Sequence, residues 1–505
     1  MFCKLISYCL NGLESVQMGV EVDLCDGLPS FDIVGLPDSA VRESKERVKS
    51  AIKNSGYEFP IKRITINLAP ADIRKEGSLY DLPIALGILG CMGIIDPLHF
   101  ENKIFLGELA LDGTLRHVSS AIPIVYGKAH TLPYILPFEN ASELQIAKHQ
   151  TLLYFHTLKE VVDYLSRNIL PTQPLPSSQL SPSHSSLDFS LDFSDVHGQE
   201  NVKRGLMIAA AGHHNTLLIG PPGCGKTMMA KRLPTILPPL TESEQIELTK
   251  IYSLASYLDV SLPIIKRPFR APHHTVTLAG LAGGGRHPKP GELSLAHLGV
   301  LFLDELLEFN KKTLETLRQP LEDGCITLAR SNDHMTFPAH FLFIAATNPC
   351  PCGYYPDTTR CHCDVPTIRR YLSKLSGPLL DRIDLHLEIQ PVSFLSLKKG
   401  SCLSSSQIRE SVKQAQARQE ERYKGESFTS NHQIPTHLLS KYCPLDSDAE
   451  RLLDHWFQSV GASARSYARI LRIARTISDL EDKALIDEDV MCEAIGYRLL
   501  DRKFY

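Results

Sequence analysis

Eight consecutive residues match the phosphate-binding pattern G-x-x-x-x-G-K-[ST]. They follow an apolar, strand-like run at 216–219 and precede a helical stretch at 228–233. In this context we expect backbone N–H groups, free to turn at three glycines, to face phosphate oxygens. The loop consists of Gly220, Pro221, Pro222, Gly223, Cys224, Gly225, Lys226 and Thr227. Because Lys226 would reach the β and γ phosphates and Thr227 would supply a hydroxyl to Mg²⁺, the sequence predicts ATP and Mg²⁺ as cofactors.

Two later apolar runs end in side chains suited to nucleotide hydrolysis. Residues 300–305 read VLFLDE, which places Asp304 to hold Mg²⁺ and Glu305 to polarise the attacking water. Residues 341–349 read FLFIAATNP, and the amide of Asn348 could orient that water near the γ phosphate. An ordinary strand end and a buried structural asparagine are the alternatives. The phosphate-binding loop upstream favours the functional interpretation.

Two sets of arginines have spacings that leave their roles open. Arg382 lies between two aspartates in SGPLLDRIDL, where it could pair locally or be presented to a neighbouring subunit's γ phosphate. The second set repeats at offsets of four, three and three residues, which puts its members on one side of a helix. This set consists of Arg465, Arg469, Arg472 and Arg475. Spacing alone favours a solvated basic face for it.

Four cysteines within 14 residues form the pattern C-x-C-x8-C-x-C shortly after Asn348. They are Cys350, Cys352, Cys361 and Cys363. Four soft thiolates suit a closed, tetrahedral Zn²⁺ site, which would be structural because no open ligand position is evident. C-x2-C is the commoner spacing, so free thiols stay an alternative. A bound metal would brace the loop between Asn348 and Arg382.

The composition bounds the class of protein. At about 150 residues per domain, 505 residues predict three domains, with two or four as alternatives. A net charge of -4 excludes a grossly basic nucleic-acid coat. The longest charge-free apolar stretch, residues 82–95, is too short to span a bilayer, so we expect a core segment and no membrane partner. Thirteen cysteines without a recognisable secretory signal predict reduced thiols and a cytoplasmic protein.

Periodicity along the chain predicts an α/β fold. Residues 38–55 carry a helical pattern, and residues 63–68 and 103–106 are typical of strands. After a Pro/Ser-rich segment at 171–186, apolar runs alternate with helical stretches, which indicates a parallel sheet with helical crossovers, and the last hundred residues look helical. We predict four parts: an N-terminal domain at 1–165, a linker at 166–190, an ATPase core at 191–390 and a helical part at 391–505.

Six ungapped motifs run through the chain: DVHGQ (195–199), the phosphate-binding loop, RAPHHT (270–275), GELSLAHLGVLFLDEL (291–306), ATNPCPCGYY (346–355) and SGPLLDRIDLH (376–386). Together they resemble the ComM (YifB) family of magnesium-chelatase-like AAA+ ATPases over nearly the whole chain. The resemblance implies an AAA+ P-loop core with a helical lid, assembled as a homo-hexameric ring with active sites between subunits. It also implies that Arg382 is the arginine finger, Asn348 is sensor 1 and Arg465 is the sensor-2 arginine.

The resemblance further implies two insertions that line a central channel. A helix-2 insert would fall at 278–290 and a presensor-1 hairpin at 324–335. Arg286, Lys289 and Arg330 are then candidate contacts to DNA phosphates, because a motor that must ignore sequence binds the backbone. Loose surface loops are the alternative. Six copies of these cations would concentrate positive charge in a ring whose outer surface stays mildly acidic.

Three stretches near the N-terminus read PSFDIVGLPDSAVRESKERV (29–48), ITINLAPADIRKEG (64–77) and GELALDGTLR (107–116). Through them the N-terminal 165 residues resemble the Lon-protease-like domain found in this family. A Lon-type peptidase needs a serine nucleophile activated by a lysine. The resemblance puts Leu79 at the position of the serine and Ile122 at the position of the lysine, while Ser78 is one position away. Both members of the dyad are missing, so we expect a catalytically degenerate binding or assembly module.

These implications lead to one functional hypothesis and two alternatives. The hypothesis is an ATP-dependent DNA helicase that promotes branch migration in homologous recombination during natural transformation, with single-stranded and branched DNA and recombination proteins as partners. One alternative is a magnesium-chelatase subunit, against which the Lon-like domain and the cysteines argue. The other is an ATP-driven protein remodeller, which would call for an aromatic pore loop, whereas the candidate loops here are glycine-rich and basic.

Overall fold

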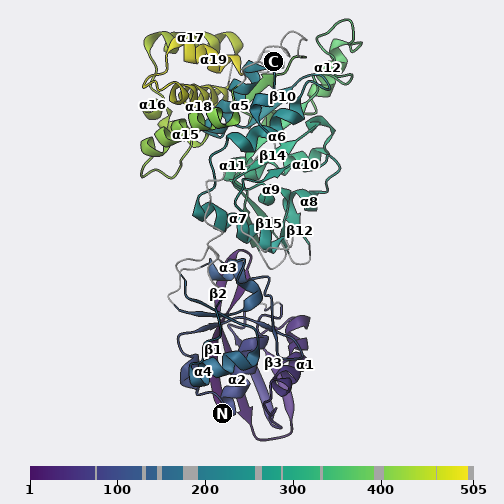
Figure 1. Cartoon of the computed structure of the whole chain (residues 1–505). Helices are drawn as coiled ribbons and strands as arrows, with labels where there is room; N and C mark the ends of the chain where they lie inside the picture. Colours follow the sequence, from purple (N-terminus) through teal and green to yellow (C-terminus); the bar gives the residue numbers. More distant parts are fainter. Residues whose placement is uncertain are drawn as a thin grey trace. The chain divides into compact units, whose positions relative to one another are not determined.

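The computed structural model describes residues 1–73, 75, 77–127, 132–144, 150–173, 191–255, 264–285, 288–329, 334–391, 403–461 and 463–498. The chain divides into two units, residues 1–183 with 241–264 and residues 184–240 with 265–505 (Figure 1). Residues 174–190, most of the predicted linker, lie outside the described part. The division into four parts stays a prediction.

A seven-stranded mixed sheet is the centre of the first unit, in the order β3-β4-β2-β1-β5-β8-β9. β2 pairs antiparallel with β1 and β4, and the other pairs are parallel. The strands are β1 (Phe2–Asn11), β2 (Glu14–Cys25), β3 (Ser30–Val34), β4 (Arg63–Ala69), β5 (Ile104–Phe105), β8 (Tyr134–Pro137) and β9 (Leu152–Phe155). A small hairpin of β6 (Glu108–Leu109) and β7 (Leu115–Arg116) lies apart from this sheet.

Helices cover this sheet, and two sequence predictions fall on them. The helical pattern at 38–55 is confirmed by α1 (Ser39–Asn54), which Asp38 caps by accepting a hydrogen bond from the backbone N–H of Val41. The apolar stretch at 82–95 is confirmed as core, because every residue of α2 (Asp81–Cys91) is buried. The unit also contains α3 (Ala121–Val125), α4 (Leu158–Arg167) and α7 (Glu242–Leu254), and α7 contacts α3.

The two positions at which a Lon-type protease would carry its serine and lysine lie in the core of this unit. Leu79 and Ile122 are both buried. The neighbouring Ser78 donates its hydroxyl hydrogen to the carboxylate of Glu108. That this domain is catalytically degenerate stays a prediction.

A five-stranded, wholly parallel sheet organises the second unit. Its order is β11-β14-β17-β10-β18, and every neighbouring pair is parallel. The strands are β11 (Phe269–Arg270), β14 (Val300–Leu303), β17 (Leu342–Thr347), β10 (Thr216–Ile219) and β18 (Leu385–Glu388). The predicted parallel sheet is therefore confirmed. Since all its strands run one way, residues that follow them meet at one edge and residues that precede them meet at the opposite edge.

Short helices and two hairpins connect these strands. The hairpins are β12 (Gly283–Gly284) with β13 (Lys289–Pro290), and β15 (Cys325–Ala329) with β16 (His334–Pro338). The helices are α5 (Glu200–Gly212), α6 (Lys226–Ile236), α8 (Leu278–Ala282), α9 (Glu292–Leu295), α10 (Lys311–Glu315), α11 (Arg318–Asp323), α12 (Val365–Leu372) and α13 (Gly377–Leu380). Hairpins therefore occur where the two insertions were expected, and their roles stay predictions.

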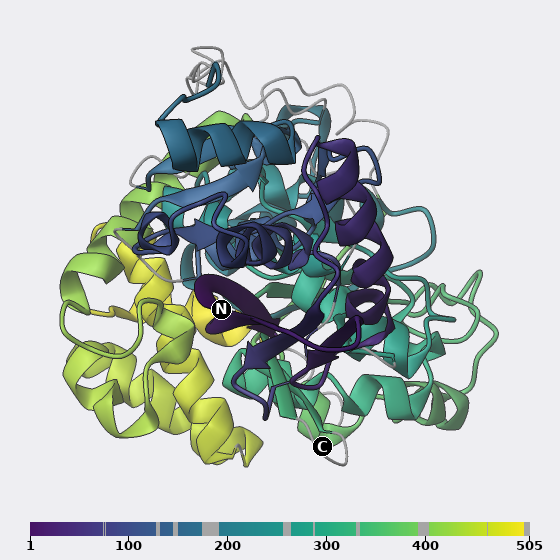
Figure 2. The ribbon, with the colours of Figure 1, turned by 90° about the horizontal axis from the view of Figure 1, so that it is seen from below.

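The C-terminal part of the second unit is helical, as predicted (Figures 1 and 2). It contains α15 (Ser405–Arg422), α16 (Leu439–Tyr442), α17 (Ser447–Val460), α18 (Ala464–Leu480) and α19 (Glu488–Gly496). α15 and α18 pack against α5, which connects this group to the sheet. The apolar face of α17, with Leu453 and Trp456, is buried in a core shared with α18 and α19. Among the helices of the described ranges, none is both long and apolar enough to cross a bilayer.

Candidate functional site

The loop between β10 and α6 has the backbone of a phosphate cradle. Gly223 and Gly225 have φ angles of 75° and 95°, which side-chain-bearing residues rarely adopt. Gly220 leaves no room for a side chain, because a Cβ there would lie 2.5 Å from the carbonyl oxygen of Ile389. Since α6 begins at Lys226, its N-terminal N–H groups face the space that phosphates would enter.

The amine of Lys226 lies within this loop. It donates to the carbonyl oxygens of Gly220 at 2.6 Å and Pro221 at 3.0 Å, and to Oδ1 of Asn348 at 3.1 Å. Burial lowers the pKa of this amine from its ordinary value. Its three hydrogens are committed to oxygen acceptors, and phosphate oxygens could replace the two carbonyls without loss of donor bonds. Lys226 and Asn348 are thus brought together as predicted, although 122 positions separate them.

The two expected Mg²⁺ ligands also meet. Thr227 donates its hydroxyl hydrogen to Oδ2 of Asp304 at 2.6 Å. Glu305 follows with a left-handed backbone (φ 51°) and a side chain that is 59% exposed, so its carboxylate can reach a water molecule. Nδ1 of His274 lies 3.8 Å from Oε2 of Glu305. We did not predict this contact, although His274 lies within the RAPHHT motif.

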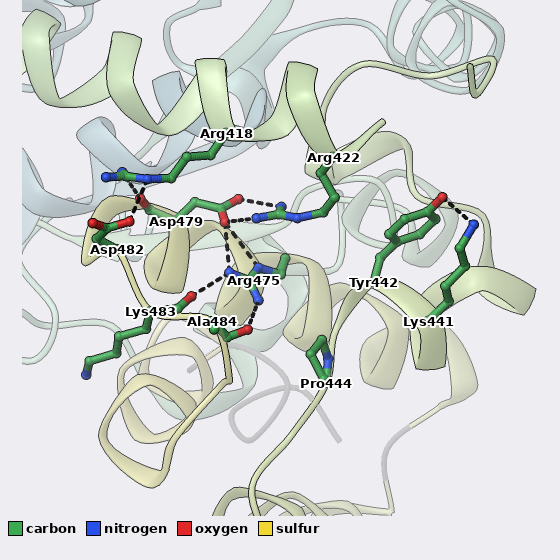
Figure 3. A pocket seen from close by; sticks show the side chains of 10 residues that line it. All are labelled: Arg418, Arg422, Lys441, Tyr442, Pro444, Arg475, Asp479, Asp482, Lys483 and Ala484. Carbon is green, nitrogen blue, oxygen red and sulfur yellow. Dashed lines mark hydrogen bonds and ion pairs between the residues drawn. The ribbon is translucent and has the colours of Figure 1, made fainter. Parts of the chain in front are cut away.

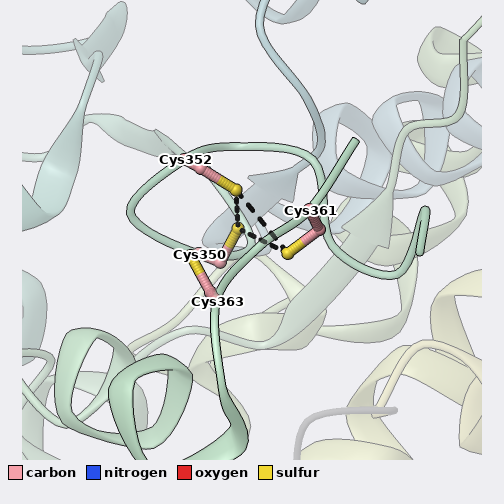
Figure 4. Close-up of side chains that lie close together, drawn as sticks. All are labelled: Cys350, Cys352, Cys361 and Cys363. Atoms are coloured by element: carbon pink, nitrogen blue, oxygen red, sulfur yellow. Dashed lines mark hydrogen bonds between the residues drawn. The ribbon is translucent and has the colours of Figure 1, made fainter. Parts of the chain in front are cut away.

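Four sulfur atoms gather beside this edge of the sheet (Figure 4). The ligand atoms of Cys350, Cys352, Cys361 and Cys363 all lie within 4.8 Å of one another. The Sγ of Cys350 lies 3.3 Å from that of Cys352 and 3.8 Å from that of Cys361. Zn–S bonds of about 2.3 Å at tetrahedral corners put sulfurs about 3.8 Å apart, so the donor set and spacing fit such a metal. A backbone hydrogen bond from Tyr354 lowers the pKa of the Cys352 thiol to about 6, which favours the ligating thiolate.

The cysteine loop touches the phosphate-binding loop directly. Gly353 has a φ of 87°, and a Cβ at this position would lie 2.7 Å from Cδ of Pro222. Cys350 accepts hydrogen bonds from the backbone N–H groups of Gly353 at 3.2 Å and Tyr355 at 3.4 Å. The conformation of the cysteine loop therefore limits the position of the phosphate-binding loop.

Arg382 and Arg465 lie at the opposite edge of the sheet. Arg382 comes just before β18, whose first residue pairs with the first residue of β10, so the length of β10, about 13 Å, lies between this edge and the phosphate-binding loop. The guanidinium of Arg382 contacts the carboxylate of Glu322 and the carbonyl oxygen of Pro378. Arg465 is 68% exposed, and its Nη1 lies 3.2 Å from Oδ2 of Asp381. The structure thus brings both arginines to one surface.

The solvated basic face predicted for α18 is wrong. Of its four arginines, Arg469 and Arg475 are buried, and Arg472 donates to the carbonyl oxygen of Ile434 at 2.9 and 2.6 Å. Arg469 pairs with Asp381 and Asp384 beside β18, whereas Arg472 and Arg475 bond to acceptors within the helical group. Of the four, Arg465 alone is mainly exposed. Helical spacing located these side chains correctly but gave no information on what covers them.

A second group of potential ligands, His214, Asp384 and His432, lies at the same edge as Arg382. The carboxylate of Asp384 lies 2.8 Å from Nδ1 of His432 and accepts from the backbone N–H of Asn215 at 3.2 Å. Burial raises the pKa of Asp384, but the charge of His432 and the hydrogen bond from His214 outweigh it and hold the pKa well below its usual range. Arg469 also approaches this carboxylate at 3.7 Å. These contacts form an internal network of hydrogen bonds and ion pairs around one buried carboxylate.

A cavity of about 450 Å³ in the helical group has a charged lining (Figure 3). Arg422 and Arg475 both point to the carboxylate of Asp479, which is fully buried. Arg475 donates further to the carbonyl oxygens of Lys483 and Ala484, each at 2.7 Å. The other residues that line the cavity are Arg418, Lys441, Tyr442, Pro444 and Asp482. The arginines are engaged by protein acceptors, so the cavity wall is a structural network.

Removing the charge of Asp479 is expected to destabilise the helical group. Asp479→Asn leaves the buried guanidinium of Arg475 and the partly buried guanidinium of Arg422 without their anion, at a cost of about 3–5 kcal/mol. Denaturant unfolding followed by tryptophan fluorescence measures this, because Trp456 lies in the same core. Asp482→Asn is the matched control: its carboxylate is 76% exposed and pairs with Arg418, so a change below about 1 kcal/mol is expected. Equal effects of the two substitutions would contradict the assignment.

The structure covers one of the three candidate DNA contacts. Lys289 lies on β13 and is exposed. Arg286 and Arg330 lie outside the described residues. Lys289 belongs to the β12–β13 hairpin, and Arg330 falls between β15 and β16 in the sequence. DNA contact at these positions stays a prediction.

Known protein families match three stretches of the chain. Residues 192–397 match the family of magnesium chelatase, subunit ChlI, and residues 403–498 match magnesium chelatase, subunit ChlI C-terminal. Residues 20–140 match the family described as subunit ChlI of Mg-chelatase. The first match contains the phosphate-binding loop, both carboxylates and the cysteine loop.

Two relatives align over nearly their whole length, and a third aligns over a much smaller part. The uncharacterized protein YifB of Salmonella typhimurium is 43% identical over 97% of this chain and 96% of its own length. The competence protein ComM of Haemophilus influenzae is 41% identical over 97% of this chain and 96% of its own length. The magnesium-chelatase 67 kDa subunit of Heliobacterium mobile is 25% identical over 39% of this chain and 31% of its own length. Likeness to the chelatase subunit is therefore both weaker and more local.

Proposed function

Because the chain belongs to the ComM/YifB family of magnesium-chelatase-like AAA+ ATPases, we propose that it is an ATP-driven DNA motor. In this proposal a homo-hexameric helicase promotes branch migration of recombination intermediates during natural transformation. The observation that carries the ATPase part is the junction of Lys226, Thr227, Asp304 and Asn348 at one edge of the parallel sheet. Similarity to a competence protein supports the DNA part.

Each residue at this edge has a defined task in hydrolysis. Thr227 and Asp304 would hold Mg²⁺, which supplies charge neutralisation of the phosphates. Lys226 binds the β and γ phosphate oxygens, Glu305 accepts the proton of the attacking water, and Asn348 orients that water. His274 keeps the carboxylate of Glu305 within reach of the site.

The arginines at the opposite edge act on a neighbouring subunit. Arg382 and Arg465 precede or flank the start of β18, whereas the phosphate-binding loop follows the end of the parallel strand β10. A guanidinium side chain reaches about half the length of that strand. In this proposal Arg382 and Arg465 both act in trans, on the γ phosphate bound by the next subunit of a ring.

DNA is bound in the channel of this ring. Lys289, with Arg286 and Arg330, contacts backbone phosphates of single-stranded and branched DNA. Sixfold repetition concentrates these cations in the channel, although each chain carries a net charge of -4. Recombination proteins act beside this motor in the cytoplasm, and the C-terminal helices serve as the lid of the ATPase core.

The N-terminal 165 residues form a Lon-protease-like module that binds or assembles without proteolysis, since apolar residues replace the dyad.

The cysteine loop holds a structural zinc ion. Four thiols within 4.8 Å of one another suit Zn²⁺ better than a set of free thiols, which have no reason to converge. When bound, the metal fixes the loop geometry and does no chemistry on ATP. Because Gly353 contacts Pro222, a fixed cysteine loop also restricts the position of the phosphate-binding loop.

Purified protein is expected to carry about one Zn²⁺ per chain by elemental analysis. Cys352→Ser removes one of four ligands and should lower this content at least tenfold at equal chelator concentration. Cys492→Ser is the control, because Cys492 is exposed on α19 and outside the cluster. Less than about half an equivalent in the unsubstituted protein would contradict the zinc site.

Magnesium insertion is the second candidate, favoured by the match to chelatase subunit ChlI. The DNA motor is preferred because relatives over the full length include a competence protein, whereas a chelatase subunit aligns over 39% of the chain. An ATP-driven protein remodeller is the third. The glycines around Gly283 and Gly284 in the first hairpin make a poor aromatic pore loop.

One experiment separates these functions. ATPase rates are measured without DNA and with single-stranded, duplex and three-stranded branched DNA at two salt concentrations, together with strand release from the branched substrate. A DNA motor is stimulated in a salt-sensitive way and releases strands only with ATP. Absence of stimulation by every DNA would reject the motor and leave metal insertion into a porphyrin and polypeptide unfolding as the next assays.

A further inference from the structure

Arg382 has an unusual environment for an arginine near the surface. Its side chain is mainly buried, Nη2 pairs with the carboxylate of Glu322, and Nη1 donates to the carbonyl oxygen of Pro378. Nε is buried and has no hydrogen-bond acceptor within the described residues. A guanidinium with an unmet donor is held incompletely, so its position depends on the charge of Glu322.

Glu322 lies at the base of the second hairpin. It belongs to α11, which ends at Gly324 with a left-handed φ of 65°, and β15 begins at the next residue. A Cβ at Gly324 would lie 1.8 Å from the ring of His340, so this junction is tightly packed. The backbone N–H of Ala339 donates to the carbonyl oxygen of Gly324 at 2.7 Å.

Side-chain bonds also tie α11 to the hairpin. The amide of Gln319 on α11 accepts from the backbone N–H of Thr327 and donates to its hydroxyl, both at 3.3 Å. Thr327 is in β15 and faces Thr336 of β16. Two side-chain bonds and a packed junction thus connect α11, and with it Glu322, to the hairpin.

We propose that Glu322 is a positioning residue that holds Arg382 on its own subunit and releases it when the β15–β16 hairpin is displaced by DNA. This proposal rests on the proposed DNA motor. Arg382 then exchanges the carboxylate of Glu322 for the γ phosphate of the neighbouring subunit, one anion for another. The hairpin of one subunit thereby controls hydrolysis at the next site in the ring. No covalent step is involved.

The test compares the ATPase of unsubstituted protein, Glu322→Gln and Glu322→Asp with and without single-stranded DNA. Glu322→Gln keeps the shape but weakens the hold on Arg382. We expect its basal kcat to rise at least threefold and its ratio of stimulated to basal rate to fall below two, with the KM for ATP unchanged within twofold. Glu322→Asp should restore part of the ratio. Glu315→Gln is the control, because Glu315 pairs with Arg318 and should leave both rates unchanged.

The outcomes distinguish this proposal from the proposed function. An unchanged basal rate and ratio in Glu322→Gln, or an equal fall of both rates, would overturn the holding role, because a merely structural residue gives the second pattern. If DNA does not stimulate the unsubstituted protein, the DNA motor fails. In that case, a rise in the basal kcat of Glu322→Gln would still test whether Glu322 holds Arg382.

Discussion

Arg382→Ala is expected to lower the ATPase rate about a thousandfold or more while the affinity for ATP stays within about twofold. An arginine finger contributes about 10³–10⁵ in kcat because it stabilises charge that develops only in the transition state. Arg382 lies at the edge opposite the phosphate-binding loop of its own chain, so its loss leaves every nucleotide contact of that chain intact. Steady-state ATPase and equilibrium binding of a fluorescent ATP analogue measure the two quantities.

Mixing variants tests whether this arginine acts between subunits. Lys226→Ala lacks a working phosphate-binding loop but keeps Arg382, and Arg382→Ala has the converse defect. A mixed ring should recover measurable turnover at interfaces where an intact loop meets an intact arginine. Absence of recovery in mixtures that form rings, shown by sedimentation, would contradict the arrangement in trans.

Glu305→Gln is expected to bind ATP normally and to hydrolyse it about 10²–10⁴ times more slowly. A positioned general base contributes about this factor, and glutamine cannot accept the proton of water. The Mg²⁺ ligands Thr227 and Asp304 are unchanged, so binding persists. Single-turnover hydrolysis by stoichiometric enzyme measures the chemical step without product release.

Glu308→Gln is the matched control for this substitution. Glu308 lies three residues further on and contacts Lys374 at 3.8 Å, away from the Thr227–Asp304 pair. Its turnover should match that of the unsubstituted protein within about twofold. Turnover of Glu305→Gln within tenfold of the unsubstituted protein would remove Glu305 as the general base.

The ATP edge could be predicted because each of its parts is encoded locally. The glycines of the loop set the backbone between β10 and α6, and the apolar runs before Asp304 and Asn348 form β14 and β17. In a parallel sheet, strand ends meet at one edge, so local patterns were enough to bring distant side chains together. The helix at 38–55 followed from its periodicity in the same way.

The contacts that could not be predicted depend on long-range packing. The burial of Arg469 and Arg475 is decided by helices elsewhere in the chain, and periodicity reports only the side on which they lie. The pair of Glu322 with Arg382 spans 60 positions, and that of His274 with Glu305 spans 31, with no motif that couples them. Likewise α7, whose neighbours in sequence belong to the second unit, packs in the first.

The two edges of the parallel sheet also have a kinetic consequence. In the proposed ring, one edge of each subunit binds the phosphates and the other edge supplies Arg382 and Arg465 to its neighbour, so a single chain would lack a complete active site. In the proposed ring, turnover per chain therefore rises with protein concentration through the range in which rings form and collapses on dilution. The ATPase rate per chain would then report the fraction of chains assembled in rings. At a low cellular concentration of the protein, most chains would be unassembled and inactive.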